Sequence, residues 1–279
     1  MPITKDLGQG YRVHGFQTGT VTVSSEHAQY SGGGLLRIPK ILAAKNWMDP
    51  VPIWAWAIET PHGNFLVDTG ETPDYFQPGH FRDPVDHWVH HRILKLDITE
   101  NQRIDRQLAE VGLAVDQVDA VLMTHLHLDH VDGIRHLKKG TFLVPRTDWN
   151  KPIGVPKSVL PEWFEPDLIT LNKTQLPFEG AYEVTPEIKL LATPGHTFGH
   201  QSVLLSVGNT HILFAGDVCF HEGQFLREEI PGISIQIGKS RDTLRRIKQL
   251  ASEVDLVFLP SHDPESGERL LKLRATPVA

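Results

Sequence analysis

Short apolar runs recur along the chain, and the pattern of hydrophobic and polar positions predicts where its strands lie. Each run is rich in Val, Ile, Leu and Phe and has the length of a buried β-strand. Strands are predicted over residues 51–58, 64–67, 120–123, 188–192, 202–206, 211–215 and 256–259.

Two segments carry apolar residues at helical spacing instead. The clearer one begins at Thr99, whose hydroxyl can cap the first turn while the side chain of Gln102 reaches back from the third position. The second begins near Ser240 and leads into the last predicted strand. The core-facing positions are Ile104, Leu108 and Val111 in the first segment, and Leu244, Ile247 and Ala251 in the second.

Strands and helices alternate unevenly, and the beginning and centre of the chain are rich in strands. This pattern predicts a layered α/β protein, with either sheets sandwiched between helices or an open twisted sheet. Neither an internal repeat nor a low-complexity tract divides the sequence, so residues 1–279 are expected to form a single domain. Residues 71–97 hold prolines, aromatic residues and several histidines, and we expect an irregular inserted lid or binding region there.

Composition narrows the class of protein. The length of 279 residues and the 40% hydrophobic content suit one large globular domain or two small ones. The net charge of −7 gives no reason to expect nucleic acid or an anionic membrane as a partner. No export signal is evident at the start, and no stretch approaches the roughly 18 apolar residues of a membrane helix. A cytoplasmic protein is expected, and a single cysteine, Cys219, fits a reducing compartment.

Four potential metal ligands follow the predicted strand 120–123 directly. They are His125, His127, Asp129 and His130. In an extended segment the first two histidines point the same way, while the other two residues lie further along as the chain turns, so two adjacent metal sites are expected. Imidazole suits zinc, and an open coordination position lets a metal hold water and lower its pKa toward about 7. A surface turn that happens to be rich in histidine is the weaker interpretation of this spacing.

Three further candidate ligands each follow a predicted strand. His196 comes after the strand 188–192, Asp217 after 211–215, and His262 after 256–259. The loops at strand ends are where α/β proteins assemble sites from distant segments. The sequence therefore predicts a metal site that combines these three residues with the histidine-rich segment.

The motif His-x-His-x-Asp-His, followed by a distant His, Asp and His, resembles the metallo-β-lactamase superfamily. The resemblance runs from Val67-Asp68-Thr69-Gly70 to Ser261-His262-Asp263. It implies an αβ/βα sandwich, in which two mixed β-sheets are flanked by helices, and two divalent metal ions, taken to be Zn²⁺. The implied ligands are His125, His127 and His196 for the first metal, Asp129, His130 and His262 for the second, and Asp217 as the bridge.

Within this superfamily the carboxyl-terminal motif from Ser261 to Glu265 looks most like that of the N-acyl homoserine lactone hydrolases. The resemblance implies a quorum-quenching lactonase that opens the ester ring of a small amphiphilic lactone. It gives Asp129 a second role, the transfer of a proton to the leaving oxygen. Asp68 is expected to orient the ligands without touching a metal.

One position departs from the lactonase pattern. Lactonases of this group commonly carry a tyrosine three residues after the bridging aspartate, where its hydroxyl helps to hold the lactone carbonyl oxygen. This chain has Phe220 there, which cannot donate a hydrogen bond, and His221 beside it is one possible substitute. Either another donor polarises the carbonyl or the substrate differs.

Other functions use similar ligands. A thioester hydrolase of the hydroxyacylglutathione type would need a basic carboxyl-terminal cluster, for which Arg269, Lys272 and Arg274 are the candidates. A β-lactam hydrolase commonly varies at the position of His130, and a nuclease normally has a basic surface. A non-catalytic metal-binding protein is the alternative from another class, although structural zinc sites are normally closed by four ligands.

The remaining conspicuous residues are given structural roles. His87, His90 and His91 are expected to face solvent or an entrance, and Cys219 is expected to pack in the core. A homodimer is one interpretation of the apolar segment 35–56. Core packing or a groove for an acyl chain is expected for the aromatic residues Trp47, Trp54, Trp56, Phe81, Trp88, Phe220 and Phe225.

Overall fold

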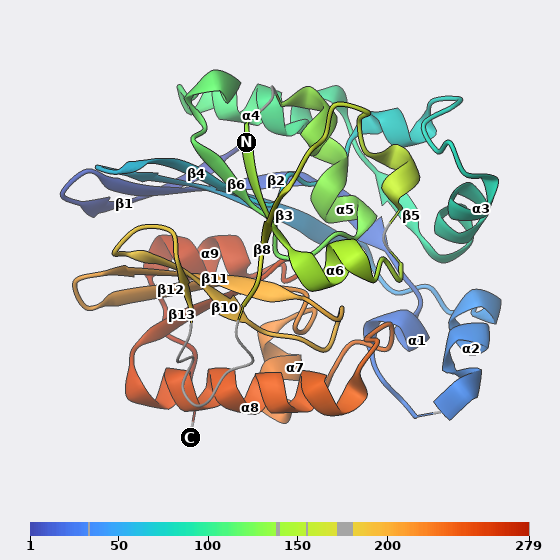
Figure 1. Cartoon of the computed structure of the whole chain (residues 1–279). Coiled ribbons are helices and arrows are strands. Elements are labelled where there is room, and N and C mark those ends of the chain that lie inside the picture. The colour runs from blue at the N-terminus through green and yellow to red at the C-terminus, as the bar shows by residue number, and fades with distance from the viewer. Residues whose placement is uncertain (33, 138–139, 155, 172–180, 279) are drawn as a thin grey trace.

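The chain forms two β-sheets that lie face to face between layers of helices (Figure 1). The structure is a computed structural model that describes residues 1–32, 34–137, 140–154, 156–171 and 181–278. Helices α4 and α5 cover the outer face of the larger sheet, and α8 lies along the outer face of the smaller one. This arrangement confirms the predicted sandwich of two mixed sheets flanked by helices.

The larger sheet has eight strands in the order β1-β2-β3-β4-β6-β7-β8, with β5 paired to β2. Strands β4, β6, β7 and β8 run parallel to one another, and the remaining pairs are antiparallel. The strands are β1 (Ile3–Gly8), β2 (Tyr11–Thr22), β3 (Val51–Thr60), β4 (Gly63–Val67), β5 (Lys95–Asp97), β6 (Ala120–Leu122), β7 (Thr141–Pro145) and β8 (Asp167–Ile169).

The smaller sheet has five strands in the order β13-β12-β11-β10-β9. Only the pair formed by β12 and β13 is parallel among the described strands of this sheet. The strands are β9 (Tyr182–Glu183), β10 (Ile188–Ala192), β11 (Gln201–Val207), β12 (Thr210–Gly216) and β13 (Leu256–Pro260).

Nine α-helices lie in the described part of the chain, most of them short. They are α1 (Ser25–Ala28), α2 (Arg37–Ala43), α3 (Pro84–Ile93), α4 (Ile104–Glu110), α5 (Leu128–Val131), α6 (Arg146–Asn150), α7 (Glu222–Arg227), α8 (Ile237–Glu253) and α9 (Ser266–Lys272). Short 3₁₀ helices cover Gly34–Leu36, Pro73–Phe76, Glu100–Gln102, Val115–Gln117, Asp132–His136 and Lys157–Val159. No helix among the described residues is both long and apolar enough to cross a membrane.

Alternate side chains of the central strands enter different cores, which explains why these strands are apolar without a break. On β12, Ile212 and Phe214 pack between the two sheets, while Leu213 and Ala215 pack beneath α8. Strands covered on both faces have no solvent side for polar residues. The ring of Phe214 lies 5.6 Å from that of Trp56 on β3, so this aromatic contact joins the two sheets.

All seven predicted strands are present, and six described strands escaped the sequence analysis: β1, β2, β5, β7, β8 and β9. The long strand β2 was missed because polar residues interrupt its apolar pattern. Those residues are buried and hydrogen-bonded: the ring of His14 bonds to Glu59 at 2.7 Å, and the hydroxyl of Thr18 donates to the carbonyl oxygen of Ile53. A satisfied polar group can be buried at little cost, and periodicity alone does not reveal that.

Two further expectations need correction. Gln102 does reach back to Thr99, but the turn that follows is a 3₁₀ helix, and the extended backbone of Arg103 delays the α-helix until Ile104. The segment 71–97 is more regular than expected, because it contains α3 and β5. Proline at the first position of α3 and the aspartate cap before it are sequence signals for that helix.

The contact between the sheets predicts a large loss of stability when it is removed. Phe214→Ala is expected to lower the free energy of unfolding by about 3–5 kcal/mol, because it leaves a cavity between two rigid sheets. Urea unfolding of the purified protein measures this change. The matched control is Phe76→Ala, a ring that is 54% exposed, for which a change within about 0.5 kcal/mol is expected. Equal effects of the two substitutions would contradict the role of Phe214.

Candidate metal centre

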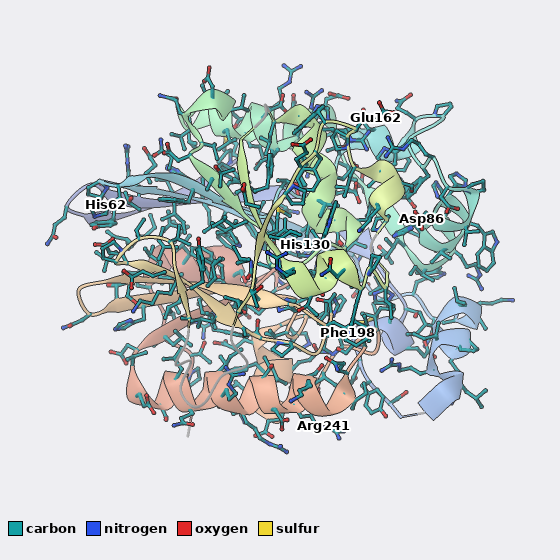
Figure 2. All side chains as sticks on the ribbon, in the orientation of Figure 1. His62, Asp86, His130, Glu162, Phe198 and Arg241 are labelled. Carbon is teal, nitrogen blue, oxygen red and sulfur yellow. The ribbon has the colours of Figure 1, made fainter. Side chains whose placement is uncertain are left out.

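The seven predicted ligands are brought together where strands end at one edge of the two sheets. Strands β10 and β12 both run antiparallel to β11, and β13 runs parallel to β12, so the three end at the same edge. His196, Asp217 and His262 follow these ends. From the larger sheet, β6 leads into the segment 124–130 at the end of the neighbouring strand β4. Figure 2 shows His130 in the interior, between the layers.

The first cluster contains His125, His127, His196 and Asp217. One ligand atom from each residue lies within 4.8 Å of the others, a span that a single metal ion can bridge. The Nε2 atom of His196 lies 2.9 Å from Nδ1 of His127 and 3.5 Å from Oδ2 of Asp217. His127 therefore faces the cluster with Nδ1.

The second cluster contains Asp129, His130 and His262, whose ligand atoms also lie within 4.8 Å of one another. The Nε2 atom of His262 is 3.4 Å from Oδ2 of Asp129, and that of His130 is 3.9 Å from Oδ1 of Asp129. Asp217 stands between the clusters, because Oδ1 lies 3.3 Å from Nε2 of His130 while Oδ2 lies 3.5 Å from His196.

The donor atoms of both clusters fit divalent cations. Buried Nε2 atoms of His125 and His130 and the Oδ1 atom of Asp217 have no hydrogen-bond partner among the described residues. Buried polar atoms are almost always paired, so unpaired lone pairs that converge on one place call for a positive ion. Imidazole with carboxylate is the donor set that zinc and other divalent transition metals prefer.

The protein holds three of the histidines from behind, so that Nε2 faces the clusters. The Nδ1 atom of His125 is 3.0 Å from the hydroxyl of Thr124, that of His130 is 2.8 Å from Oδ2 of Asp68, and that of His262 is 3.0 Å from the carbonyl oxygen of Pro52. Such contacts fix the tautomer and the orientation of a ligating imidazole. The metal-facing nitrogens are therefore positioned before any ion binds.

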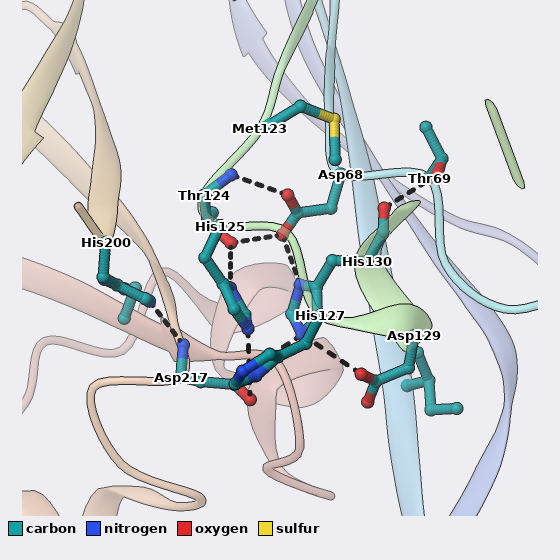
Figure 3. A network of polar contacts seen from close by, with 12 residues as sticks. Asp68, Thr69, Met123, Thr124, His125, His127, Asp129, His130, His200 and Asp217 are labelled. Atoms are coloured by element: carbon teal, nitrogen blue, oxygen red, sulfur yellow. Dashed lines mark hydrogen bonds and ion pairs between the residues drawn. The ribbon is translucent and has the colours of Figure 1, made fainter. Parts of the chain in front are cut away.

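Asp68 connects this support to the backbone, as Figure 3 shows. Its Oδ1 accepts a hydrogen bond from the amide of Thr124 at 2.7 Å, and its Oδ2 lies within hydrogen-bond distance of both the Thr124 hydroxyl and His130. The residue itself has a φ of +58°, which places it in the left-handed region as the chain leaves β4. Asp68 thus orients His130 and contacts no other predicted ligand among the described residues, as expected.

Burial and neighbouring charges divide the histidines into two kinds. Burial, together with the neighbouring histidines, holds the pKa of His125 and His196 well below the ordinary value, and burial lowers that of His127 to about 4. Burial opposes a charge on His130 as well, but the carboxylates of Asp217 and Asp68 outweigh it and raise its pKa. The first cluster thus offers neutral imidazoles, whereas His130 must release its proton when a metal binds.

His200 is a supporting residue that the sequence analysis missed. Its Nε2 accepts a hydrogen bond from the backbone amide of Asp217 at 3.0 Å, and its Nδ1 lies 2.9 Å from the Thr193 hydroxyl. Burial lowers the pKa of His200 to about 3, so the ring is neutral and can accept. Gly216 has a φ of +61°, and a Cβ there would lie 2.7 Å from the same Nε2. In the sequence, the glycine directly before Asp217 was the one sign that another group packs closely against this position.

A second missed residue, Asp148, fixes the loop that carries His196. Its two carboxylate oxygens accept hydrogen bonds from the Thr197 hydroxyl at 2.6 Å and from the Gly199 amide at 2.5 Å. Burial raises the pKa of Asp148 to about 6 despite these two donors. Asp148 lies on α6, outside any motif, so its distance along the chain from His196 concealed this contact.

A cavity of about 430 Å³ opens onto the two clusters. His127, Asp129, His196, Asp217 and His262 form its polar end. Its other walls are mainly aliphatic and come from β2, α2, α3 and the loop before α8. These aliphatic residues are Val21, Val23, Ile38, Ile41, Leu42, Val89, Ile93, Leu94, Ile153, Ile233 and Ile235. The site therefore combines a metal-binding end with an apolar compartment, the usual form of a small-molecule site.

The structure also shows where the other residues singled out in the sequence lie. His90 is buried in its wall, whereas His87 and His91 are exposed and stack on each other. Cys219 is buried in the core beneath α8, as expected. Most of the aromatic residues named above pack in cores, and Trp88 is exposed.

The carboxyl-terminal basic residues are occupied by carboxylates of the chain itself. Arg269 is fully buried and contacts Glu222 at 3.1 Å and Asp263 at 3.0 Å. Arg274 pairs with Glu222 and Glu265, and Lys272 pairs with Glu268. None of the three lines the cavity at the clusters. Arg269 and Arg274 hold the loop after β13 in place, and the three residues do not form the anion-binding patch that a thioester hydrolase would need.

Sequence comparison finds similar proteins within one superfamily. A family model described as the metallo-beta-lactamase superfamily matches residues 48–262. N-acyl homoserine lactonase AiiA of Bacillus thuringiensis subsp. kurstaki is 28% identical over 217 residues, which cover 77% of this chain and 82% of that protein. A probable metallo-hydrolase of Mycobacterium tuberculosis is 25% identical over 233 residues, which cover 75% of this chain and 73% of that protein.

Solved structures with the same fold include two lactonases. An N-acyl homoserine lactone hydrolase with N-hexanoyl-L-homoserine at its catalytic metal center matches with a TM-score of 0.73 and 22% identity, over 92% of this chain and 94% of that one. AidC, a dizinc quorum-quenching lactonase, matches with a TM-score of 0.65 and 14% identity, over 95% and 91% of the two chains. At these identities the likeness shows the fold alone.

The contacts of Asp68 predict its effect on metal binding. Asp68→Asn is expected to weaken metal affinity by about 10- to 100-fold, because asparagine has one acceptor oxygen and cannot accept from the Thr124 amide at one side-chain atom and from His130 at the other. Competition with a chromogenic chelator measures the affinity. The control is Asp49→Asn, an exposed aspartate, which should leave it unchanged. Unaltered affinity in Asp68→Asn would show that His130 needs no such support.

The cluster geometry also predicts the metal content of variants. His127→Ala removes a neutral donor of the first cluster and should reduce the bound metal from about two ions per chain toward one. Asp217→Ala should reduce it further, because Asp217 stands between the clusters. Elemental analysis after dialysis measures the content, with His87→Ala as the exposed histidine control. Full occupancy in either cluster variant would rule out that residue as a ligand.

Proposed function

The chain belongs to the metallo-β-lactamase superfamily, and from that premise we propose that it is a dinuclear metal-dependent hydrolase that opens the ester ring of lactones. N-acyl homoserine lactones are the first substrates to test, which would make the protein a quorum-quenching enzyme. The observation that carries the proposal is the position of the two ligand clusters at the polar end of an otherwise apolar cavity. An amphiphilic ester matches this cavity, because its ester group fits the polar end and its apolar chain fits the apolar walls.

The seven residues that the sequence indicated are proposed as the metal ligands. His125, His127 and His196 would hold one divalent ion, Asp129, His130 and His262 the other, and Asp217 both, with zinc as the proposed metal. When bound, the ions would supply a water of lowered pKa as the nucleophile and positive charge for the carbonyl oxygen. The buried histidine and carboxylate supports described above keep the ligand atoms in place for this chemistry.

Asp129 has a second proposed role as the group that moves a proton. Its carboxylate lines the cavity and lies 3.4 Å from Nε2 of His262 through Oδ2. Its side chain is 13% exposed, more than that of the other proposed ligands of the same cluster. A carboxylate in this place can take a proton from the attacking water and return it to the leaving alkoxide, which completes ring opening to a hydroxy acid.

The cavity favours a lactone over the thioester of an anionic tripeptide. Arg37 is the only lysine or arginine among the described residues that line it, and the carboxyl-terminal basic residues are paired elsewhere. An acyl chain would instead find aliphatic walls on several sides, where burial of each methylene is worth about 0.8 kcal/mol. A cytoplasmic location and a homodimer stay predictions from the sequence.

The proposal predicts metal-dependent ring opening. The metal-loaded protein should release one proton for each lactone hydrolysed from N-acyl homoserine lactones, and the same protein treated with a chelator should be inactive. Proton release in weak buffer measures the rate over short and long acyl chains and over simple γ- and δ-lactones. The apolar walls predict that long acyl chains react with the higher kcat/KM.

The control for this assay is His127→Ala, which keeps the cavity walls and loses a proposed ligand. Activity of that variant at the wild-type rate would contradict the assigned site. If every lactone is inert at about two bound ions per chain, the proposed reaction is wrong, and thioesters become the class to test. Binding of metal with no hydrolysis of either class would leave the non-catalytic alternative.

A further inference from the structure

The polar end of the cavity contains a position that cannot donate a hydrogen bond. Phe220 lines the cavity, and its ring stacks on that of His262 with centroids 4.9 Å apart. Its neighbour His221 does not supply the missing donor. His221 lies with Asp263 and Glu265 in a separate pocket and does not line the cavity. A donor for a substrate carbonyl must come from another element.

His27 on α1 lies across the cavity wall from the strands that carry the ligands. It lines the same cavity as Phe220, and the two rings meet edge to face with centroids 6.2 Å apart. Four of the proposed metal ligands, His127, Asp129, His262 and Asp217, are near enough for their charges to act on its pKa. His27 belongs to neither ligand cluster among the described residues.

The backbone fixes His27 in this place. The Ser24 hydroxyl caps α1 by accepting a hydrogen bond from the amide of His27, and the carbonyl oxygen of His27 accepts one from the amide of Ile233 at 3.1 Å. Ile233 also lines the cavity. The backbone of His27 is therefore held by two hydrogen bonds, and the residue is only 8% exposed.

One ring nitrogen of His27 has no hydrogen-bond partner within the described part of the chain. This atom, Nδ1, is buried. Several other buried histidines differ, because His14, His130, His200 and His262 each bond through a ring nitrogen to another group of the protein. A buried imidazole nitrogen without a partner is costly to fold, which suggests that its partner is a ligand.

The ring is neutral at physiological pH. Burial lowers the pKa of His27 to about 4. A neutral imidazole has one N–H donor and one acceptor nitrogen. It can therefore donate to an uncharged carbonyl oxygen without bringing a buried positive charge toward the metal clusters.

We propose that His27 is a substrate-binding residue that donates a hydrogen bond from its imidazole N–H to a carbonyl oxygen of the substrate. The role is one that the phenyl ring of Phe220 cannot fill. The inference rests on the proposed function, since it takes the carbonyl of an acylated lactone as the acceptor. A donor held in a dry site can stabilise charge that develops on such an oxygen during hydrolysis.

Two substitutions at the same position separate hydrogen bonding from packing. His27→Leu fills a similar volume and has no donor, whereas His27→Gln keeps an N–H. Each variant must first be shown to bind as much metal as the wild type. His27→Leu should then lower kcat/KM for an N-acyl homoserine lactone by about 10- to 100-fold. His27→Gln should lose less than His27→Leu. Equal losses in the two variants, or none in His27→Leu, would overturn the proposal.

A second variant tests whether the donor is interchangeable. Phe220→Tyr adds a hydroxyl to the same part of the cavity, and its own effect on kcat/KM is measured in the wild-type background. In the His27→Leu background it should restore a large part of the lost kcat/KM. A structural role for His27 would give no such rescue, because a hydroxyl on residue 220 cannot repair misfolding around α1. Unfolding midpoints of all four proteins show whether each variant folds.

Binding of a lactam separates this proposal from the proposed function. An N-acyl homoserine lactam keeps both carbonyl groups and resists hydrolysis, so its Kd can be measured by calorimetry on the metal-loaded protein. The Kd should rise several-fold in His27→Leu and less in His27→Gln. Equal Kd values in wild type and His27→Leu would overturn the role of His27 even where lactones are hydrolysed.

The remaining outcomes concern both proposals. If the wild type binds the lactam in a manner that depends on His27 but opens no lactone, His27 binds a carbonyl as proposed and the lactonase assignment fails. If the wild type neither binds the lactam nor opens lactones at about two ions per chain, both proposals are overturned.

Discussion

A carboxylate buried among histidines is the constraint on which the rest of the site depends. Asp217 is 4% exposed and lies within 3.9 Å of the imidazoles of His125, His130, His196 and His262. Burial opposes its ionisation, but the charges of His262 and His130 hold its pKa well below the ordinary value. Such a charge is tolerated in an interior only when it is paired. The clusters of neutral and charged imidazoles around it satisfy that condition, and two cations would satisfy it further.

The surrounding fold can be understood as the framework that keeps this arrangement in place. Each ligand follows a strand end, and a buried polar group that the strand itself does not supply fixes each loop: Asp68 for His130, His200 for Asp217, and Asp148 for the loop of His196. These supports come from distant parts of the chain. The two sheets must therefore be packed against each other before the clusters can form, which is why the aromatic contact between the sheets matters for the chemistry as well as for stability.

The sequence predicted the fold class and the residues of the two clusters better than the groups that support them. The cluster residues were visible because metal chemistry restricts candidate ligands to a few residue types at fixed spacings, as in the segment His125 to His130. The strands that lie between two cores were visible because they are apolar on both faces. In contrast, β2 contains His14 and Thr18, which are buried but paired, and Asp148 acts on a loop about fifty residues away. A partner that is distant in sequence leaves no local pattern, so these contacts required the structure.

The charges that remain unpaired near the cavity limit which substrates the site can accept. Sequence motifs alone allowed a basic carboxyl-terminal cluster, but Arg269 is fully buried and pairs with Glu222 and Asp263, so its charge stabilises the loop after β13 and is not available to a ligand. Among the described residues that line the cavity, Arg37 is then the one guanidinium, and mainly aliphatic walls surround it. A substrate with several negative charges would lose water against those walls and gain one ion pair there, which is a net cost. A neutral ester with an apolar tail loses little on entering, because its tail replaces water against Ile38, Ile41 and their neighbours, while its carbonyl groups meet the polar residues at the other end of the cavity.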